Sequence, residues 1–244
     1  MRIALITPGF SAHAHDWAIP ALLNLARALA QRHEVHVFSQ RYPARGLYQF
    51  DGLTHHAIGG EQKFGLASAR LWLRTSQAIS RQHRQTPFDL LHAFWADEAG
   101  FAAALAGLKL KRPVIVSLGG GELTDLPQIN YGAQRFLARR LTTWYALHQA
   151  TLVTAGSNYQ LDLCRAHHLP KPKLRLAPLG VDTRLFRPAQ PAPSLCSTQA
   201  GPVIVQAASL VPVKNQRLLL EVFSLVTKER PQLSVSRQPW QTSR

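Results

Sequence analysis

Short apolar runs alternate with longer amphipathic stretches through most of the chain. The runs of apolar and β-branched residues suit buried strands, which we predict at residues 2–7, 34–39, 53–58, 88–92, 113–118, 151–155 and 174–176. The stretches between them repeat apolar residues at intervals of three and four, which predicts helices at residues 17–31, 66–84, 99–108, 131–149 and 158–167. Ser157 is a suitable N-cap for the last of these helices. This alternation predicts an α/β fold, a Rossmann-like parallel sheet flanked by helices.

The pattern is interrupted after residue 187. Residues 188–201 are rich in Pro, Ser and Ala, as in a linker. We therefore predict a Rossmann-like domain at 1–187, a linker at 188–201, the start of a second α/β unit at 202–235 and an irregular tail at 236–244. The second unit offers a strand at 202–207, a helix at 215–230 and a short stub at 233–235. Roughly 35 residues cannot bury a core of their own, so this second domain is expected to be incomplete.

The net charge of +15 changes the picture of the partners. A surface this basic favours phosphate groups, as in nucleic acid, anionic lipid or phosphorylated sugars. No aromatic-rich basic strand or nucleic-acid-binding motif is present, which argues against nucleic acid. The two cysteines, Cys164 and Cys196, have no metal-type spacing and fit a reducing compartment. The short first apolar run is read as a strand, so we expect a cytoplasmic protein, with peripheral attachment to the inner membrane face as a further option.

One predicted helix, at residues 66–84, carries a basic face. Arg70, Arg74, Arg81 and Arg84 fall on one side, and the opposite side is expected to carry Leu71, Trp72, Leu73 and Ile79. The helix is either a solvated outer helix or a basic surface that docks on anionic lipid.

Three loops follow predicted parallel strands, at residues 8–16, 92–98 and 119–122. Because ligands bind at the carboxyl ends of such strands, these loops are expected to converge on one edge. His92 is interpreted as closing its strand there, either to face a ligand or as a satisfied core group. The amides of Gly119, Gly120 and Gly121 either approach a ligand or only make a turn. The first turn lacks GxGxxG and the chain lacks a P-loop, which disfavours nicotinamide and ATP. The histidines lack partners for a metal site, so no metal is expected.

The passage LAPLGVDTRLFRP (residues 176–188), a following strand and SLVPVK (209–214) resemble the interdomain passage of family-4 glycosyltransferases, typically "PNGVD…F.P" and then "GRL…K". The first strand, loop and helix, DLLHAFWADEAG and PVIVSLGGGE are similar to the acceptor-side domain of that family. The resemblance covers Met1 to about Leu233. It implies the GT-B architecture and retaining transfer of a sugar from a nucleotide-sugar donor to a hydroxyl acceptor.

The resemblance also implies roles for individual residues. Lys214, Ser209 and backbone amides near Gly9 would hold the donor diphosphate. His92 and Glu122 would be catalytic, and the turn from Gly119 to Gly121 would face the acceptor and the transferred sugar. No cofactor is expected, so protein cations and amides would stabilise the departing diphosphate.

Three departures from the family pattern stand out. Gly119 occupies the position of a donor-site His, Ser209 replaces an Arg, and the family's acidic stretch lies beyond the last residue here. We therefore expect this chain to be inactive or impaired as a transferase. The alternative is a non-catalytic basic module that binds phosphorylated glycan or an anionic membrane surface.

Overall fold

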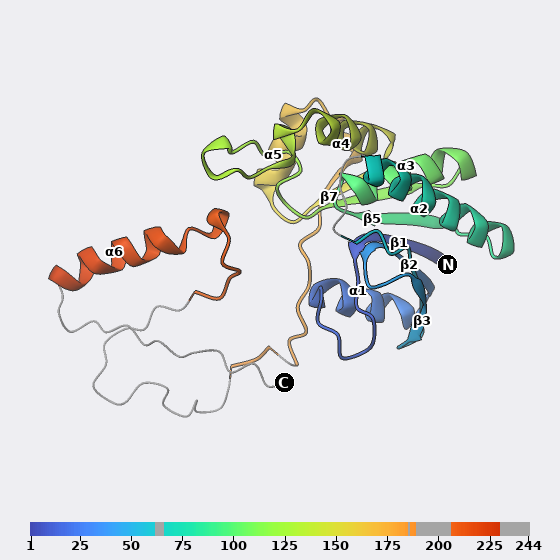
Figure 1. Cartoon of the computed structure of the whole chain (residues 1–244), viewed down its shortest axis with the longest axis horizontal. Coiled ribbons are helices and arrows are strands. Elements are labelled where there is room, and N and C mark those ends of the chain that lie inside the picture. The colour runs from blue at the N-terminus through green and yellow to red at the C-terminus, as the bar shows by residue number, and fades with distance from the viewer. Residues whose placement is uncertain (62–65, 185, 189–205, 230–244) are drawn as a thin grey trace. The chain divides into compact units, whose positions relative to one another are not determined.

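The computed structural model describes residues 1–61, 66–184, 186–188 and 206–229. It divides into two compact units, Met1–Val181 and Asp182–Arg244, which are treated separately below. Figure 1 shows their helices and strands.

The first unit is built on an eight-stranded sheet in the order β3-β4-β2-β1-β5-β6-β7-β8. The strands are β1 (Arg2–Gly9), β2 (Glu34–Tyr42), β3 (Gly46–Phe50), β4 (Leu53–Ala57), β5 (Leu90–Phe94), β6 (Val114–Leu118), β7 (Leu152–Ala155) and β8 (Leu174–Leu176). All neighbouring pairs are parallel except β3 and β4. The predicted α/β fold with a parallel sheet flanked by helices is therefore confirmed.

The antiparallel edge strand β3 was not predicted from the sequence. It forms a hairpin with β4 through Asp51 and Gly52, whose φ angles of 52° and 73° are both positive. An Asp-Gly pair with positive φ at both positions is a strong signal for a two-residue hairpin. That dipeptide lies between two runs with apolar residues, so the sequence did contain the signal.

Helices cover both faces of the sheet. Helix α1 (Pro20–Ala30) buries Leu22, Leu23 and Ala26 in a cluster with Leu5 and Val37. The opposite face carries α2 (Leu66–Gln85), α3 (Glu98–Leu110), α4 (Leu137–Gln149) and α5 (Asn158–Ala166). Successive strand residues point to opposite faces, so Ala4 and Ile6 of β1 belong to this second cluster while Leu5 belongs to the first.

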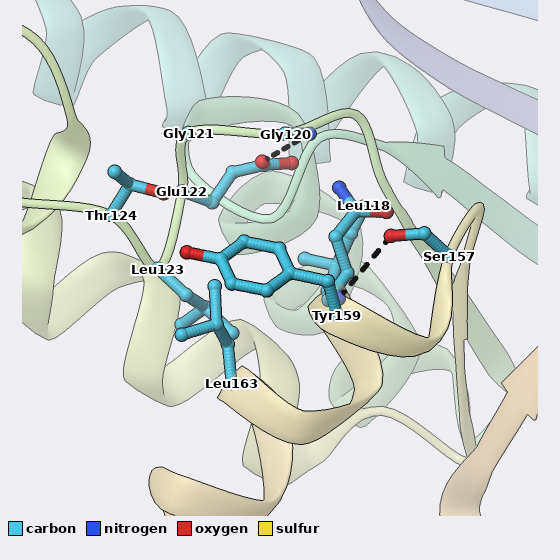
Figure 2. A pocket seen from close by; sticks show the side chains of 10 residues that line it. Leu118, Gly120, Gly121, Glu122, Leu123, Thr124, Ser157, Tyr159 and Leu163 are labelled. Atoms are coloured by element: carbon cyan, nitrogen blue, oxygen red, sulfur yellow. Dashed lines mark hydrogen bonds between the residues drawn. The ribbon is translucent and has the colours of Figure 1, made fainter.

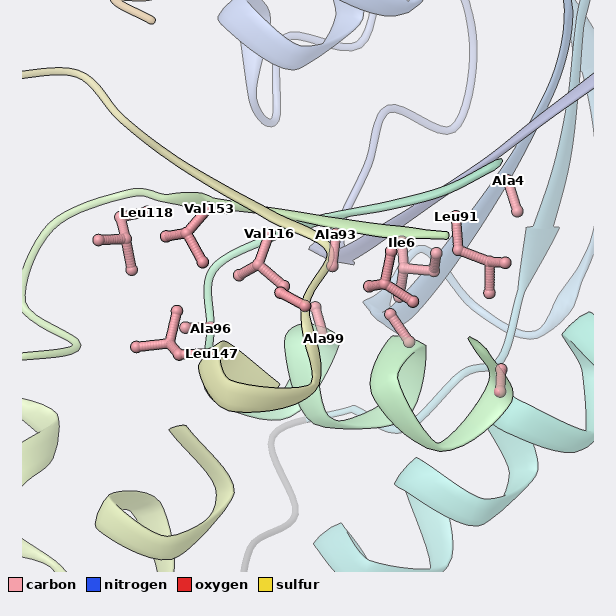
Figure 3. Packing of buried hydrophobic residues seen from close by; sticks show 14 of the residues in the cluster. Ala4, Ile6, Leu91, Ala93, Ala96, Ala99, Val116, Leu118, Leu147 and Val153 are labelled. Carbon is pink, nitrogen blue, oxygen red and sulfur yellow. The ribbon is translucent and has the colours of Figure 1, made fainter. Parts of the chain in front are cut away.

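Helix α3 occupies the middle of the helical layer. Its buried residues are all Ala or Gly, and Ala99 packs beside Ile6, Ala93 and Val116 of the sheet (Figure 3). At Gly107 an added Cβ atom would lie 2.2 Å from Cγ2 of Val114. The small side chains therefore let this helix lie close against the sheet, with α2 and α4 on its flanks.

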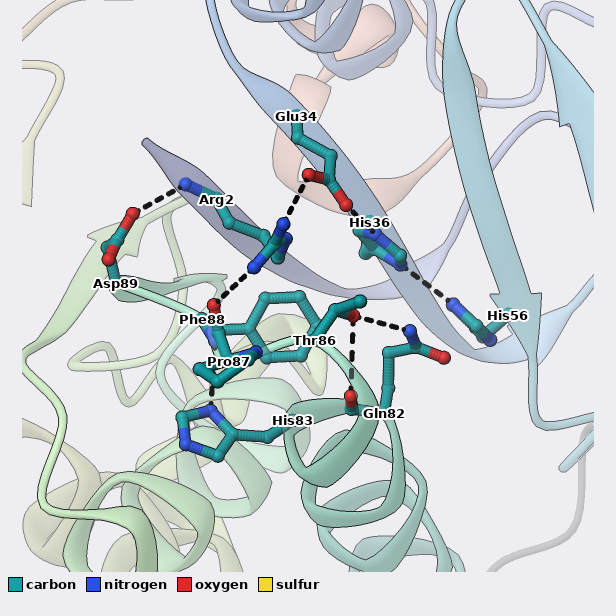
Figure 4. Close-up of polar contacts among 10 residues, drawn as sticks. All are labelled: Arg2, Glu34, His36, His56, Gln82, His83, Thr86, Pro87, Phe88 and Asp89. Atoms are coloured by element: carbon teal, nitrogen blue, oxygen red, sulfur yellow. Dashed lines mark hydrogen bonds and ion pairs between the residues drawn. The ribbon is translucent and has the colours of Figure 1, made fainter.

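The amino ends of three strands are joined by a polar network (Figure 4). The Arg2 guanidinium is 2.8 Å from the Glu34 carboxylate and donates to the carbonyl of Pro87, and the Arg2 amide donates to Asp89. The hydrogen bond from Arg2, with a second from His36, lowers the pKa of Glu34 to about 2. This edge of the sheet is therefore occupied by contacts within the protein.

Several predicted element boundaries are wrong, two of them next to the sheet edge that the loops share. The helix predicted at residues 131–149 begins only at Leu137, after short 3₁₀ turns at Pro127–Ile129 and Ala133–Arg135. Pro8 and Gly9 do not break the first strand, which continues to Gly9 alongside β2. The N-cap prediction is confirmed, because the Ser157 hydroxyl accepts a hydrogen bond from the amide of Gln160 at 3.3 Å.

In the second unit, the structure describes residues 182–184, 186–188 and 206–229. A 3₁₀ turn at Pro212–Lys214 precedes α6 (Gln216–Glu229), close to the predicted start. Large apolar side chains of α6 are exposed, among them Leu218, Leu220 and Leu225. Most of the predicted strand at 202–207, the stub at 233–235 and the tail at 236–244 lie outside the described residues, and the incomplete second domain stays a prediction. No helix in the described part of the chain is both long and apolar enough to cross a membrane.

Candidate active site

The carboxyl ends of β1, β5 and β6 lie next to one another in the sheet, because these strands are parallel neighbours. The loops that follow them meet there, as predicted. Pro8, Trp95 and Asp97 line one cavity, and a Cβ atom at Gly119 would lie 2.2 Å from Nε1 of Trp95. This edge is where open α/β sheets bind ligands.

The first cavity, which we call the strand-end pocket, has a volume of about 350 Å³. It is lined by Pro8, Ile19, Arg41, Trp95, Asp97, Glu98 and Arg139. Arg41 donates two hydrogen bonds to the Glu98 carboxylate, at 2.7 and 2.6 Å, and one from Nη1 to the carbonyl of Glu61. Burial opposes ionisation of Glu98, but the bonds and charge of Arg41 outweigh it and lower its pKa. The Arg41–Glu98 pair thus forms a fixed wall of the pocket.

Of the two carboxyl groups in the strand-end pocket, Asp97 is the one whose pKa is raised. Burial and the neighbouring Glu98 charge raise its pKa, while the Glu98 amide and the Arg139 guanidinium act in the opposite direction. A half-buried carboxyl group with a raised pKa, in a cavity beside a cation, is typical of functional sites. A raised pKa makes a carboxylate a stronger proton acceptor, which suits a group that takes up a proton during a reaction.

The glycine turn after β6 is organised by Glu122. The two oxygens of its carboxylate accept hydrogen bonds from the amides of Gly119 at 2.8 Å and Gly120 at 2.7 Å. Its carbonyl accepts a further bond from the side chain of Gln134. Burial raises the pKa of Glu122, against the effect of these amides. Two amides that were expected to approach a ligand are therefore occupied within the loop.

A second cavity, the glycine-loop pocket, lies beside this turn and has a volume of about 370 Å³ (Figure 2). Its lining residues are Leu118, Gly120, Gly121, Glu122, Leu123, Thr124, Ser157, Tyr159, Gln160 and Leu163. Hydroxyl and amide side chains stand here beside leucines and the Tyr159 ring. Such a mixture can exchange hydrogen bonds with a polyhydroxylated ligand while covering its apolar faces.

The interpretation that His92 closes its strand is wrong, because β5 continues to Phe94. The Nε2 atom of His92 lies 2.8 Å from the Ser117 hydroxyl, which is 2.6 Å from the Thr154 hydroxyl on the next strand. Burial lowers the pKa of His92 to about 4. His92 is thus part of a polar row across β5, β6 and β7, and it lines neither of the two pockets.

The predicted donor-phosphate residues fall in both units. Gly9 ends β1, with Tyr42 as its partner on β2, and the neighbouring Pro8 lines the strand-end pocket. Lys214 and Ser209 lie in the second unit with exposed side chains. Their carbonyls accept hydrogen bonds from the side chains of Gln206 and Gln216, which stabilise the turn before α6.

Sequence reasoning did not identify the residues that line the strand-end pocket, notably Arg41, Trp95, Asp97 and Arg139. A signal existed for Trp95 and Asp97, which directly follow a buried strand in the stretch HAFWADEAG. Trp95 also has a φ of 69°, unusual for a bulky residue and often found at functional sites. Arg41 and Arg139 come from elements distant in sequence, so only the fold brings them together. The described residues contain no group of three or more His, Cys, Asp or Glu side chains arranged to hold a metal ion.

Several solved structures share this fold. HepE from Anabaena, in complex with UDP and glucose, matches with a TM-score of 0.63 and 17% identity, over 96% of this chain and 60% of that one. Sucrose-phosphate synthase from Thermosynechococcus elongatus matches with a TM-score of 0.57 and 14% identity, over 98% and 71%. UDP-N-acetylglucosamine 2-epimerase from Rickettsia bellii matches with a TM-score of 0.50 and 9% identity, over 96% and 52%. At these identities the likeness shows the fold alone, and the chain spans 60% or less of two of these three proteins.

The family of the chain follows from its sequence. No curated protein matches the chain. The model of Glycosyltransferase Family 4 matches residues 21–185, which include most of the sheet, the whole lining of the glycine-loop pocket and the Gly-Val-Asp passage after β8. The chain belongs to Glycosyltransferase Family 4.

Proposed function

We propose that this chain provides the acceptor-side half of a retaining glycosyltransferase, which moves a sugar from a nucleotide-sugar donor to a hydroxyl acceptor. The observation that carries this proposal is the pair of pockets at the carboxyl edge of a sheet that belongs to this family. HepE, which has the same fold, was solved with UDP and glucose. Its complex supports a nucleotide sugar as the donor class.

The two pockets suggest separate tasks. The glycine-loop pocket, with its hydroxyls and the amide of Gln160, suits the acceptor or the transferred sugar. The strand-end pocket combines Asp97, which can take up the acceptor's proton, with the cation of Arg139. Lys214, Ser209 and the backbone near Gly9 would hold the donor diphosphate, as the family resemblance implies. Stabilisation of the departing diphosphate then depends on fixed cations and amides.

The catalytic assignments of His92 and Glu122 stay predictions. The hydrogen bonds of both side chains support a positioning role, His92 through Ser117 and Glu122 through the glycine turn. A positioning residue acts on the reaction by holding others in place, and misplacement by about 1 Å can cost a hundredfold in rate.

We also propose that the 244-residue chain by itself is an impaired transferase. Ser209 stands where the family pattern has an Arg, whose guanidinium would hold the diphosphate through two hydrogen bonds. A hydroxyl group lacks that charge and geometry. Lys214 has an exposed side chain beside a helix whose apolar residues are exposed. A cation that is loosely held contributes little to a transition state.

The test is binding and transfer by the purified 244-residue chain. Saturation-transfer NMR with UDP-hexoses and with simple glycosides should show millimolar or weaker contacts, and a radiolabelled-donor assay should show no transfer. Asp97→Asn and Gln160→Ala should reduce the glycoside contacts, whereas Asp125→Asn, at an exposed carboxylate outside both pockets, should not. Clear turnover would contradict the proposed impairment. Contacts unchanged in both pocket variants would contradict the assigned site.

A second candidate function is a non-catalytic basic module that binds phosphorylated glycan or an anionic membrane. The observation that favours it is the exposure of Arg70, Arg74, Arg81 and Arg84 on α2. The expected apolar side of this helix needs one correction, because Leu73 is exposed among the arginines, while Leu71 and Ile79 are buried. Anionic vesicles and heparin-like glycans should bind the wild type at low salt, and Arg→Gln changes at all four positions should weaken that binding.

A further inference from the structure

Helix α4 has apolar residues on two sides. One side buries Thr142, Thr143, Ala146 and Leu147. On the other side, Leu137, Leu141 and Trp144 follow one another at intervals of four and three residues, with exposed fractions of 69%, 59% and 57%. Phe136, just before the helix, is exposed as well. These four residues form a continuous exposed surface, which we call the α4 stripe.

Positive charge surrounds the α4 stripe. The guanidinium carbons of Arg135 and Arg139 lie 5.9 and 5.7 Å from the centre of the Phe136 ring, within cation–π distance. Arg140 projects from the exposed side of the helix. The sequence contains no Asp or Glu between Asp125 and Asp162. This stretch of chain therefore adds cations and no carboxylate to the surface around the stripe, while Asp97 lies with Arg139 in the strand-end pocket.

A groove continues the stripe toward the end of α5. It has a volume of about 240 Å³, and its residues are Leu123, Gln134, Leu137, Arg140, Leu141, Thr143, Trp144, Leu147, His148, His167 and Leu169. Leucines and the Trp144 ring form most of its walls, with Arg140, His148 and His167 as its basic members. The groove is therefore complementary to a ligand with an apolar chain that ends in an anionic group.

We propose that the α4 stripe and its groove dock on the surface of an anionic lipid bilayer. Leu137, Leu141 and the indole of Trp144 enter the boundary between headgroups and acyl chains, where Trp is favoured because one part of its ring is apolar and its N–H needs a polar partner. Arg135 and Arg140 reach the lipid phosphates, since long basic side chains can lie along apolar surface with the charge outside. Charge complementarity identifies the partner as a lipid surface.

Helix α2 is the weaker surface for this task. It carries four exposed arginines but only one large exposed apolar residue within its described part, Leu73. Attraction by charge alone is screened within about 8 Å at physiological salt, whereas burial of apolar surface persists. Both helices flank α3 on the same face of the sheet, so α2 can add long-range attraction. The contact that persists at physiological salt should depend on α4.

A second copy of the chain is the competing partner for an exposed apolar helix. The net charge of +15 opposes such self-association, because two such surfaces repel one another. The arginines around the α4 stripe would have to be brought together with no carboxylates between Asp125 and Asp162 to pair with them. A bilayer rich in phosphates has no such cost.

The experiment measures sedimentation of the whole chain with phosphatidylcholine vesicles, with and without phosphatidylglycerol, at low and physiological salt. The key variant combines Leu137→Gln, Leu141→Gln and Trp144→Gln. One control replaces the four α2 arginines with Gln, and a second, Leu108→Gln, removes an apolar residue of α3 that is also exposed. At physiological salt the triple variant should bind anionic vesicles at least about tenfold more weakly, while both controls should stay within about threefold of the wild type.

Circular dichroism melts should show that every variant is folded, since all these side chains are exposed. The proposal is overturned if the triple variant binds as the wild type does, if only the α2 variant loses binding, or if the wild type binds no anionic vesicles. It is equally overturned if sedimentation of the lipid-free chain reveals a dimer that the triple variant disperses, since the α4 stripe would then join two copies.

Discussion

At the scale of single residues, the glycine turn after β6 shows how a sequence pattern can be recognised while its cause is missed. Three glycines after a buried strand predict that another group lies close to the backbone. In the structure the Glu122 carboxylate accepts hydrogen bonds from two of the amides, and the side chains of Trp95 and Tyr131 lie against the glycines. At Gly121, which has a φ of 89°, a Cβ atom would lie 2.6 Å from the Tyr131 hydroxyl. The conformation of the turn is therefore determined by contacts with other residues of the protein.

Removing the Glu122 carboxylate should loosen this turn. Glu122→Ala leaves the amides of Gly119 and Gly120 without their acceptor, which should lower the free energy of unfolding by about 2–4 kcal/mol. Urea titration measures this loss, and amide hydrogen exchange at the two glycines should accelerate. Asp125→Ala, at an exposed carboxylate three residues later, serves as the control. Unchanged exchange at both glycines would contradict the anchoring role.

Protonation of His92 should make stability depend on pH. Its pKa is about 4 in the folded chain and about 6.5 when unfolded, so its contribution is complete above pH 6.5 and is lost as the pH falls toward 4. Between pH 7 and pH 5 this amounts to about 2 kcal/mol. Urea titrations across this range should show a smaller pH dependence for His92→Gln than for the wild type. Because His55 and His56 also have pKa values near 4, some dependence should remain. Identical pH profiles would contradict the burial argument.

The misreading of His92 has a simple physical origin. Residues 93 and 94, Ala and Phe, are apolar and continue the strand, but a histidine between apolar residues looks like a boundary when only the sequence is read. Its hydrogen bond to Ser117 joins two strands 25 residues apart. Pairings of this kind depend on strand register, which the sequence does not state. The glycine turn and Glu122, in contrast, were found because they are adjacent in the chain.

At the scale of elements, α3 packs closely against the sheet through its small residues. At Gly107 an added methyl group would lie 2.2 Å from Val114, so Gly107→Ala should shift the helix from the sheet and lower the free energy of unfolding by about 1–3 kcal/mol. A methyl group at Gly180 would meet no atom within 4 Å, so Gly180→Ala is the matched control. Thermal and urea melts compare the two. A Gly107→Ala variant as stable as the wild type would show that the helix can move at little cost.

The elements that the sequence predicted well are those with a strong local pattern. The buried strands and helices α1, α2, α3 and α5 appear near their predicted positions. The early start predicted for α4 failed because residues 131–136 have helical spacing but lie in a loop. There Gly132, with a φ of 111°, approaches the carbonyl of Thr124, and the backbones of Leu126 and Tyr131 pair. That loop is determined by contacts with the glycine turn, which outweigh local propensity.

At the scale of the whole molecule, the first unit contains every described strand and both pockets. A fragment that ends at Val181 keeps both hydrophobic clusters and should therefore fold alone. Its circular dichroism spectrum should keep the α/β signature, and its melting temperature should lie within a few degrees of that of the full chain. A fragment that melts without cooperativity would show that residues after 181 stabilise the sheet.

The position of Trp95 offers a way to see ligands optically. Its indole forms part of the wall of the strand-end pocket and lies against Gly119, which connects to the glycine-loop pocket. An occupant of the strand-end pocket changes the polarity around this ring, and the wavelength of indole emission depends on that polarity. Comparing the wild type with Trp95→Phe would separate this signal from that of the other four tryptophans. A library of sugars and nucleotides can then be screened by colour alone, without any assumption about the reaction.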